Sequence, residues 1–200
     1  MAFGVLLTSA AVAYPGGTWH EPGRVGFSFW NNFWCDLLSS RALNGEANAL
    51  GAALARAAFA LFAYALHRFW PLAVARAHAS GAALHATPIG RFGAGCLLAV
   101  ALVPAASSQV VHGVAVVVSA GTSLVAIGLL LRGLQRSGQV GALQLGSATI
   151  LVALLCLGQY VHQGCCGGRD ASWLAGMQKI TTIFLLAFMV RLLRGAAPSP

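Results

Sequence analysis

The sequence predicts an all-α fold, a polytopic membrane bundle of six transmembrane helices. The chain of 200 residues is 58% hydrophobic and only 8% charged, whereas soluble domains carry about 25% charged residues. Its mean hydropathy is +0.76. Its apolar residues gather in runs of about 20, the length of helix that crosses roughly 30 Å of hydrocarbon.

Five apolar runs define the second to sixth predicted spans. They cover residues 47–67, 89–107, 110–131, 143–162 and 173–193. Each run is expected to be helical, because backbone groups in lipid must be paired within their own segment. Residues 1–195 then form a single transmembrane domain, followed by a disordered tail at 196–200.

The first apolar segment, residues 1–13, is short for a span. The AVA sequence before Tyr14 resembles a signal cleavage site, but no basic residues precede the apolar stretch, as they do in a secretory signal. We therefore favour a first transmembrane helix, which gives six spans. A cleaved signal would leave five.

Loop charges predict the orientation. Seven arginines fall on one side of the membrane: Arg68, Arg76, Arg91, Arg132, Arg136, Arg191 and Arg194. The other side carries three arginines and every acidic residue of the chain: Arg24, Arg41, Arg169, Glu21, Asp36, Glu46 and Asp170. The positive-inside rule places the first group, and with six spans both termini, in the cytoplasm. A composition rich in arginine, alanine and glycine is typical of a GC-rich bacterial genome, so we expect the bacterial inner membrane.

The outer loop at residues 14–46 is too polar to span a membrane and too aromatic for a free loop. Tryptophan favours the membrane interface, where its ring is buried and its polar edge is wet. We predict an interfacial or re-entrant helix over residues 27–40, with Asn31, Asn32 and Asp36 turned inward. YPGG and the Asn-Gly pair of RALNGEAN predict turns, and Asn44 or Asn48 would cap the next span.

Two cations lie inside predicted spans. Arg56 is roughly 12 Å and Lys179 roughly 9 Å from the outer ends of their helices. A charge at such a position usually faces the bundle and has a partner. One interpretation is a structural ion pair with Asp36 or Glu46 that fixes the loop to the bundle. The other is an anion site for a lipid phosphate, a carboxylate or a quinone oxygen.

The outer side also gathers cysteines and histidines. Cys35 could form a disulfide with Cys165 or Cys166, since disulfides persist on the oxidising side. The rival hypothesis is a metal or haem site that uses His112, His162 and Asp36, although HQGCC is not a strong metal signature. The sequence indicates no cofactor beyond this alternative, in which zinc or haem would bind.

Two segments carry a resemblance to a known family. The first is YPGG followed by GFSFWNNFWCDLL and NGEAN, and the second is MQKITTIFLLAF. They resemble uncharacterised six-span prokaryotic membrane proteins whose first loop reads approximately YPG…GYSF…N…SDLG, within the broader DRAM/FRAG/Sfk-type group. The chain departs from that pattern at Cys35, where serine is expected, and at Leu37-Leu38. The resemblance implies a six-helix fold and important outer-loop residues, but no reaction.

The residues favour a non-enzymatic membrane protein that binds a lipid or small anionic ligand at its outer mouth. Arg56, Lys179 and Gln178 would contact the anion, and Asn32 and Asp36 would orient them. The alternatives are an intramembrane metal-dependent lipid hydrolase and a structural subunit of a larger membrane complex. Nucleic acid is not an expected partner despite the net charge of +8, because the arginines form no basic face.

Small residues suit close contact between helices. We expect such contacts at Gly51 and Ala55, and at Gly121 and Gly128.

Overall fold

The computed structural model describes residues 2–166 and 173–195, with side chains described for 2–163 and 173–195. This part of the chain is all-α, with six α-helices, two short 3-10 helices and no strand. The elements in order are α1 (Ala2–Ala13), η1 (Trp34–Leu38), α2 (Ala49–Arg76), η2 (Gly81–His85), α3 (Ala86–Leu102), α4 (Gln109–Arg136), α5 (Val140–Cys166) and α6 (Leu174–Arg194).

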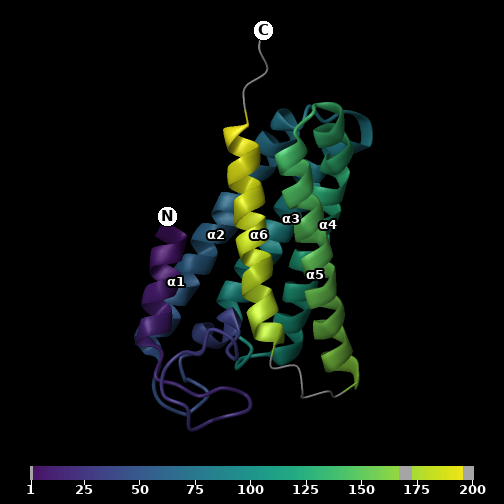
Figure 1. Cartoon of the computed structure of the whole chain (residues 1–200). Coiled ribbons are helices and arrows are strands. Elements are labelled where there is room, and N and C mark those ends of the chain that lie inside the picture. The colour runs from purple at the N-terminus through teal and green to yellow at the C-terminus, as the bar shows by residue number, and fades with distance from the viewer. Residues whose placement is uncertain (1, 167–172, 196–200) are drawn as a thin grey trace.

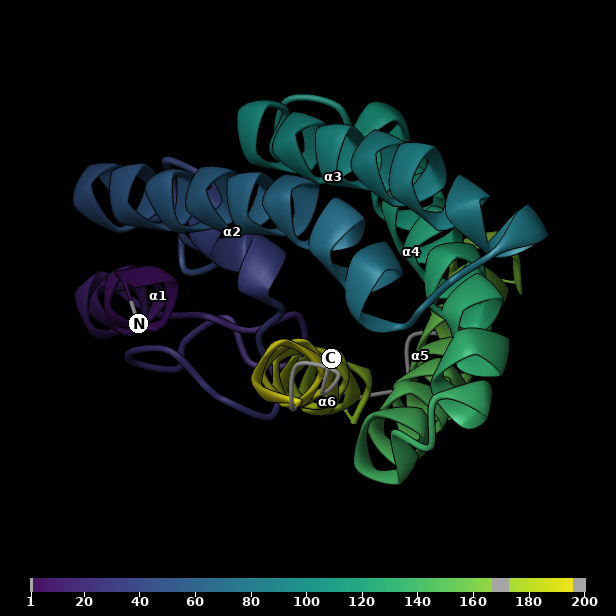
Figure 2. The same cartoon turned by 90° about the horizontal axis from the view of Figure 1, so that it is seen from above.

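The long helices form an elongated bundle with the first loop, residues 14–48, at one end (Figure 1). The C-terminal ends of α2, α4 and α6 lie at the opposite end of the bundle. Along the bundle axis, α2, α3, α4 and α5 follow one another in a curved row, and α6 lies on its concave side (Figure 2). The short α1 packs beside the loop-side half of α2, where Phe3 stacks on Phe62 with ring centroids 4.7 Å apart.

Four helices, α2, α4, α5 and α6, are long and apolar enough to cross a membrane. Their outward faces are apolar as well, since Leu151 and Ile183 are 62% and 58% exposed. Exposed apolar surface on this scale is unusual for a soluble monomer. The structure is therefore consistent with a membrane protein. The 12 residues of α1 reach only about 18 Å, and α3 about 26 Å with 17 residues.

Two apolar clusters hold the helices together. One fills the loop-side half and joins α1, η1, α2 and α3 around Leu37, Leu38 and Phe59. The other fills the opposite half, where Phe69 of α2 and Phe188 of α6 meet edge to face at 6.0 Å. The first loop thus contributes to the core and does not simply cover it.

Glycines permit close helix contact, but not all of those predicted. Gly51 faces Ala10 of α1, and Ala55 is fully buried, as expected. A Cβ at Gly121 or Gly128 would meet nothing within 4 Å, so these two do not mediate packing. The closest contacts occur elsewhere, for example at Gly93, whose carbonyl accepts a hydrogen bond from Ser119 of α4.

The boundaries of two helices differ from the prediction. α2 continues past residue 67 to Arg76 and includes Pro71, because Trp70 and Ala73 are buried in the second cluster and hold this segment helical. α3 ends at Leu102 and not at residue 107. Pro104 explains this end, since proline disfavours the helical conformation in the residue before it.

The helix predicted over residues 27–40 is wrong except for five residues, which form η1. The rest of the first loop is irregular and is closed by two isolated bridges, Gly16 to Val25 and Arg41 to Ala47. The predicted turns are present, because Gly17 and Gly45 both adopt φ +86°. Only glycine takes that conformation readily.

Candidate functional site

The candidate site is formed where η1 lies between α2 and α6 (Figure 1). Each of these helices offers one cation to the first loop. Lys179 of α6 donates to the carbonyl oxygen of Asn32, and Arg56 of α2 donates from Nε to the carbonyl oxygen of Leu38 at 3.1 Å. The two residues flank η1, so both cations predicted to lie within spans bind the loop backbone and not a carboxylate.

Lys179 occupies an aromatic box. Its Nζ lies 5.4, 5.3 and 4.9 Å from the ring centroids of Phe27, Phe29 and Trp34. It also donates to the carbonyl of Ala175, one turn earlier in α6, at 3.0 Å. The side chain is only 1% exposed. Ring faces and carbonyl oxygens together replace the water that the ammonium loses on burial.

The first turns of α6 hold the loop at two further points. Gln178 accepts a hydrogen bond from the backbone N–H of Trp34 at 2.9 Å through Oε1. Gly176 lies against the ring of Trp30, and a Cβ at Gly176 would clash with that ring. The GFSFWNNFW segment is therefore shaped to bind α6, which explains why so many aromatic residues occur in one loop.

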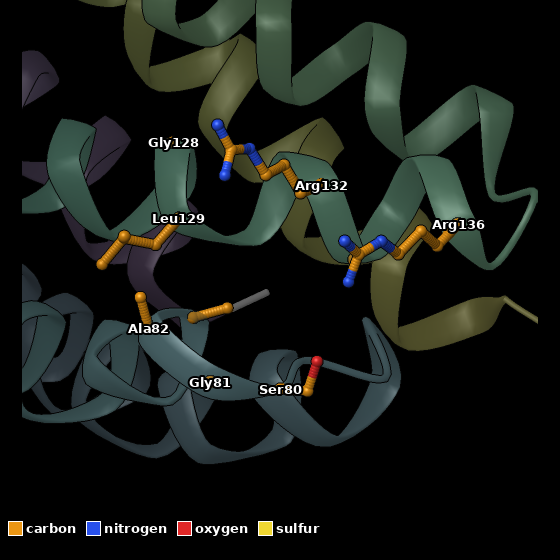
Figure 3. A pocket seen from close by; sticks show the side chains of 9 residues that line it. Ser80, Gly81, Ala82, Gly128, Leu129, Arg132 and Arg136 are labelled. Atoms are coloured by element: carbon orange, nitrogen blue, oxygen red, sulfur yellow. The ribbon is translucent and has the colours of Figure 1, made fainter.

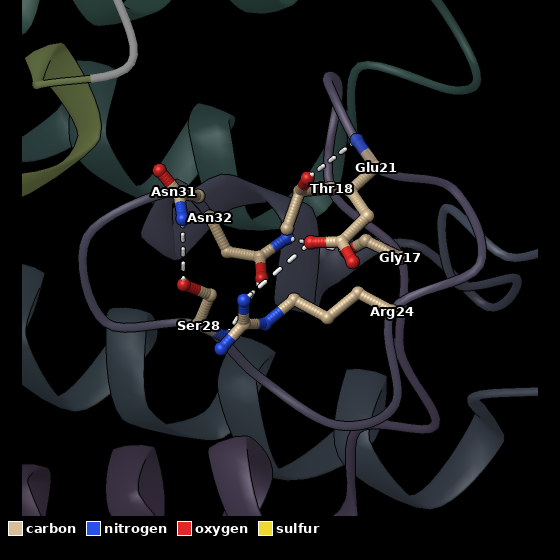
Figure 4. A network of polar contacts seen from close by, with 7 residues as sticks. All are labelled: Gly17, Thr18, Glu21, Arg24, Ser28, Asn31 and Asn32. Atoms are coloured by element: carbon tan, nitrogen blue, oxygen red, sulfur yellow. Dashed lines mark hydrogen bonds and ion pairs between the residues drawn. The ribbon is translucent and has the colours of Figure 1, made fainter.

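Asn32 organises the interior of the loop, and Figure 4 shows its surroundings. Its Oδ1 accepts from the N–H of Ser28 at 2.9 Å. Its Nδ2 donates to the carbonyl of Gly17 at 2.8 Å and to Oδ2 of Asp36 at 3.2 Å. The side chain is fully buried. One amide thus joins the YPGG turn, the aromatic segment and η1.

Asp36 is buried and serves as an acceptor for three donors. Its Oδ2 accepts from the N–H of Phe33 at 2.8 Å and from Asn32, and its Oδ1 accepts from Nε1 of Trp19 at 3.3 Å. Burial raises the pKa of the Asp36 carboxyl from 3.8 to about 6, although these hydrogen bonds and the positive charge of Lys179 oppose the increase. Desolvation is therefore the dominant influence on this group.

The stability of the protein should consequently fall as pH rises from about 4 to about 6. A carboxyl whose folded pKa exceeds its unfolded pKa favours the folded state most when it is protonated, so its contribution is lost as pH rises through about 6. We expect a loss on the order of 2 kcal/mol. Thermal unfolding in detergent at several pH values measures it. Asp36→Asn should flatten this part of the profile, and a wild-type midpoint that rises over the same window would contradict the assignment.

Arg56 differs from Lys179 because it is only partly buried and only partly paired. No residue in the described part of the chain accepts a hydrogen bond from its two Nη nitrogens, and these atoms are not among the buried unsatisfied ones. The residue lies seven positions after Ala49, the start of α2, or about 10 Å along the helix. Arg56 therefore presents free donors and a positive charge at a depth where lipid is expected.

The ion pairs expected for these cations are wrong for the described residues. Among them the single pair within 4.0 Å is Arg24 with Glu21, at 3.5 Å on the loop surface (Figure 4). Glu46 is exposed and accepts from Asn44. Asp36 already accepts three N–H donors, which leaves the cations to carbonyl oxygens and rings.

The residues of the metal hypothesis are not brought together. Nδ1 of His112 lies 2.8 Å from the carbonyl oxygen of Val103, so this buried ring joins the end of α3 to the start of α4. His162 is exposed on α5. Across residues 2–163 and 173–195, no three histidine, cysteine, aspartate or glutamate side chains are placed to hold a metal ion.

The disulfide hypothesis depends on side chains outside the described residues, those of Cys165 and Cys166. Cys35 itself lies in η1 next to Asp36. Burial raises the pKa of the Cys35 thiol to about 12, and the nearby carboxylate adds to the effect. At neutral pH this thiol is protonated and is a poor nucleophile.

Four of the five predicted ligand-binding residues do lie together. Asn32, Asp36, Gln178 and Lys179 belong to one connected set of contacts, while Arg56 lies on the other side of η1. The sequence reasoning missed the aromatic box. A single lysine in an apolar helix, in a chain with five aromatic residues over Phe27–Trp34, is the signal that could have identified it.

Comparison with protein-family models, with curated proteins and with solved structures finds no match.

Proposed function

We propose that the chain is a multi-pass membrane protein that binds the anionic headgroup of a lipid at Arg56, beside the first loop. The observation that carries the proposal is the pairing of Arg56. Its Nε is used by Leu38, while its two Nη nitrogens have no partner among the described residues and are not buried. A guanidinium at hydrocarbon depth needs an anion, and its planar donor fork suits a phosphate or carboxylate.

The other predicted ligand contacts support the site indirectly. Lys179 is enclosed by the aromatic box and has no surface for a ligand. Gln178, Asn32 and Asp36 bind the loop and one another. Their role in this proposal is to hold η1 against α6, which places the carbonyl of Leu38 where it orients Arg56.

The proposed membrane arrangement follows the charges. The loop end carries the described acidic residues, and the arginines at the ends of α2, α4 and α6 lie at the opposite end. We infer that the opposite end is cytoplasmic in a bacterial inner membrane. All six α-helices enter the membrane in this proposal, and α1 covers the loop-side half only. The resemblance to uncharacterised six-span prokaryotic proteins of the DRAM/FRAG/Sfk-type group is retained as part of the proposal.

The test is native mass spectrometry of the protein released from nanodiscs that contain phosphatidylglycerol and phosphatidylcholine. We expect the wild type to retain phosphatidylglycerol and Arg56→Gln to lose one bound molecule of it. Arg41→Gln is the matched control, because Arg41 lies in the first loop near the start of α2, donates to the carbonyl of Gly45 and is exposed. Arg41→Gln should retain the lipid.

Unchanged lipid retention in Arg56→Gln would refute the proposal. If Arg56→Gln fails to accumulate, Arg56→Lys separates the two roles, because lysine keeps the positive charge and cannot reproduce the guanidinium fork. A folded Arg56→Lys protein that retains less lipid than the wild type supports the site. Equal retention in Arg56→Lys shows that charge and not the guanidinium fork holds the lipid; the uncharged Arg56→Met should then lose it, and retention in Arg56→Met refutes the site.

A structural subunit of a larger complex is the second candidate, and the surface of the first loop favours it. Trp19 and Trp30 are 62% and 59% exposed. Exposed tryptophans suit either the membrane interface or a protein partner. The same spectra distinguish the two, since a stable heteromeric mass after mild extraction would support the subunit.

A further inference from the structure

A cavity of about 520 Å³ opens at the end of the bundle opposite to the first loop. Figure 3 shows its two walls. One wall is the last part of α4, with Gly128, Leu129, Arg132 and Arg136, and the other is the segment of residues 80–83 at the start of η2. The cavity therefore has cationic groups beside apolar ones.

The two arginines of this cavity have no anionic partner in the part of the chain that the structure describes. Arg132 and Arg136 are exposed and lie four residues apart, so they project from one face of α4. Within the described residues, neither takes part in a side-chain hydrogen bond or an ion pair. The described acidic residues, Glu21, Asp36 and Glu46, all belong to the first loop at the far end of the molecule. No acidic side chain among the described residues is therefore placed to serve as a counter-ion for these arginines.

The position of the cavity along α4 points to a lipid headgroup. α4 has 28 residues and is about 42 Å long, whereas the hydrocarbon layer is about 30 Å thick. The last turns of α4 therefore reach the headgroup layer. Leu129, Ala82 and Ala83 supply an apolar wall beside the arginines, as expected where the glycerol and upper acyl chain of a lipid would lie.

Gly128 keeps this cavity open. A Cβ at Gly128 would meet nothing within 4 Å, so the glycine is not required for helix packing. Its lack of a side chain leaves space in front of Arg132. Gly133, by contrast, packs against the carbonyl of Ala77 and fixes the C-terminal end of α2 beside the cavity.

We propose that this cavity binds the phosphate group of an anionic lipid through Arg132 and Arg136. The site is separate from Arg56 and lies in the leaflet at the other end of the bundle. Two guanidinium groups one turn apart provide bidentate donors for phosphate oxygens. The proposal does not depend on the lipid site beside the first loop.

The experiment is a titration of the full chain in the Arg56→Gln background with short-chain phosphatidic acid, followed by native mass spectrometry. Gly128→Leu fills the cavity and leaves both arginines in place, and the fold should tolerate it because the position is open. Gly121→Leu is the matched control, since Gly121 is also open but does not line the cavity. We expect Gly128→Leu and the double change Arg132→Gln with Arg136→Gln each to weaken binding by about tenfold or more. Gly121→Leu should bind as its parent does.

Two results would overturn the proposal. Unchanged affinity in both Gly128→Leu and the double arginine variant would show that the lipid binds elsewhere. Inorganic phosphate that competes with the same affinity as phosphatidic acid would show that the acyl chain contributes nothing, and the assignment to a lipid would be wrong. If the double variant fails to fold, Gly128→Leu alone decides, because it alters no charge.

Discussion

Replacement of Lys179 by alanine is expected to detach the first loop from α6 and to lower the free energy of unfolding by about 3 kcal/mol. Two losses contribute. The carbonyl of Asn32 loses its buried donor, and an unpaired buried carbonyl costs about 1–3 kcal/mol. The aromatic box also loses the side chain that fills it, and such cavities cost about 2–5 kcal/mol. Relief from burying an ammonium offsets part of the total.

Lys179→Met is the informative companion of the alanine variant. Methionine fills the box but cannot donate to the carbonyl of Asn32, so we expect a midpoint of thermal unfolding between those of the wild type and Lys179→Ala. Loop opening is measured independently by hydrogen exchange at residues 27–36, which should increase in both variants. Because buried charges can often be replaced by apolar residues without loss, a Lys179→Met protein as stable as the wild type with a protected loop would refute the anchoring role.

The helices were the most predictable feature of the molecule. The five apolar runs correctly located α2, α3, α4, α5 and α6, because a run of about 20 apolar residues has few alternatives to a helix. Their ends were less predictable. Residues 68–76 extend α2 beyond its apolar run, since Trp70 is packed against Gly90 of α3. That contact joins residues far apart in sequence, which no local pattern reports.

The first loop shows what a local pattern cannot give. The side chains of Asn32 and Asp36 meet in the folded loop, but the helix predicted over residues 27–40 is not what brings them together. The side chains of Asn32 and Asp36 instead accept from the backbone N–H groups of Ser28 and Phe33, and such bonds compete with helical ones. Asn48 is also used by the loop, although through its Nδ2 donor. It stands at the N-cap of α2, yet its side chain binds the carbonyls of Leu37 and Ser39.

The predicted topology was a good guide to which site residues lie together. The charges were a poor guide to which groups bind them. The predicted topology put all acidic residues and the outer ends of the helices on one side of the membrane. It therefore predicted that Asp36, Gln178 and Lys179 lie near one another. Charge then suggested ion pairs, which was wrong because a carboxylate in a loop has many backbone donors to accept from. Carbonyl oxygens occur at every residue, so the sequence does not mark those that bind Arg56 and Lys179.

Replacement of Asn32 by alanine should destabilise the protein by about 3 kcal/mol, an effect similar to that of Lys179→Ala. The side chain makes three hydrogen bonds and is fully buried. Alanine would leave the N–H of Ser28 and the carbonyl of Gly17 without these partners, at about 1–3 kcal/mol for each group that stays buried and unpaired. The carboxylate of Asp36 would also lose one donor, so its pKa should rise further above its ordinary value.

Asn31 provides the control within the same dipeptide. It is only partly buried and makes a single side-chain bond, to Oγ of Ser28 at 3.1 Å, so Asn31→Ala should change the free energy of unfolding by about 0.5 kcal/mol or less. Asn32→Asp keeps the shape but turns a carboxylate toward the carbonyl of Gly17 and toward Asp36, and it should be less stable than Asn32→Ala at neutral pH. The difference in stability between Asn32→Asp and Asn32→Ala should become smaller as pH falls and the carboxyl groups become protonated. Equal midpoints for the Asn31 and Asn32 alanine variants would show that the loop does not depend on this amide.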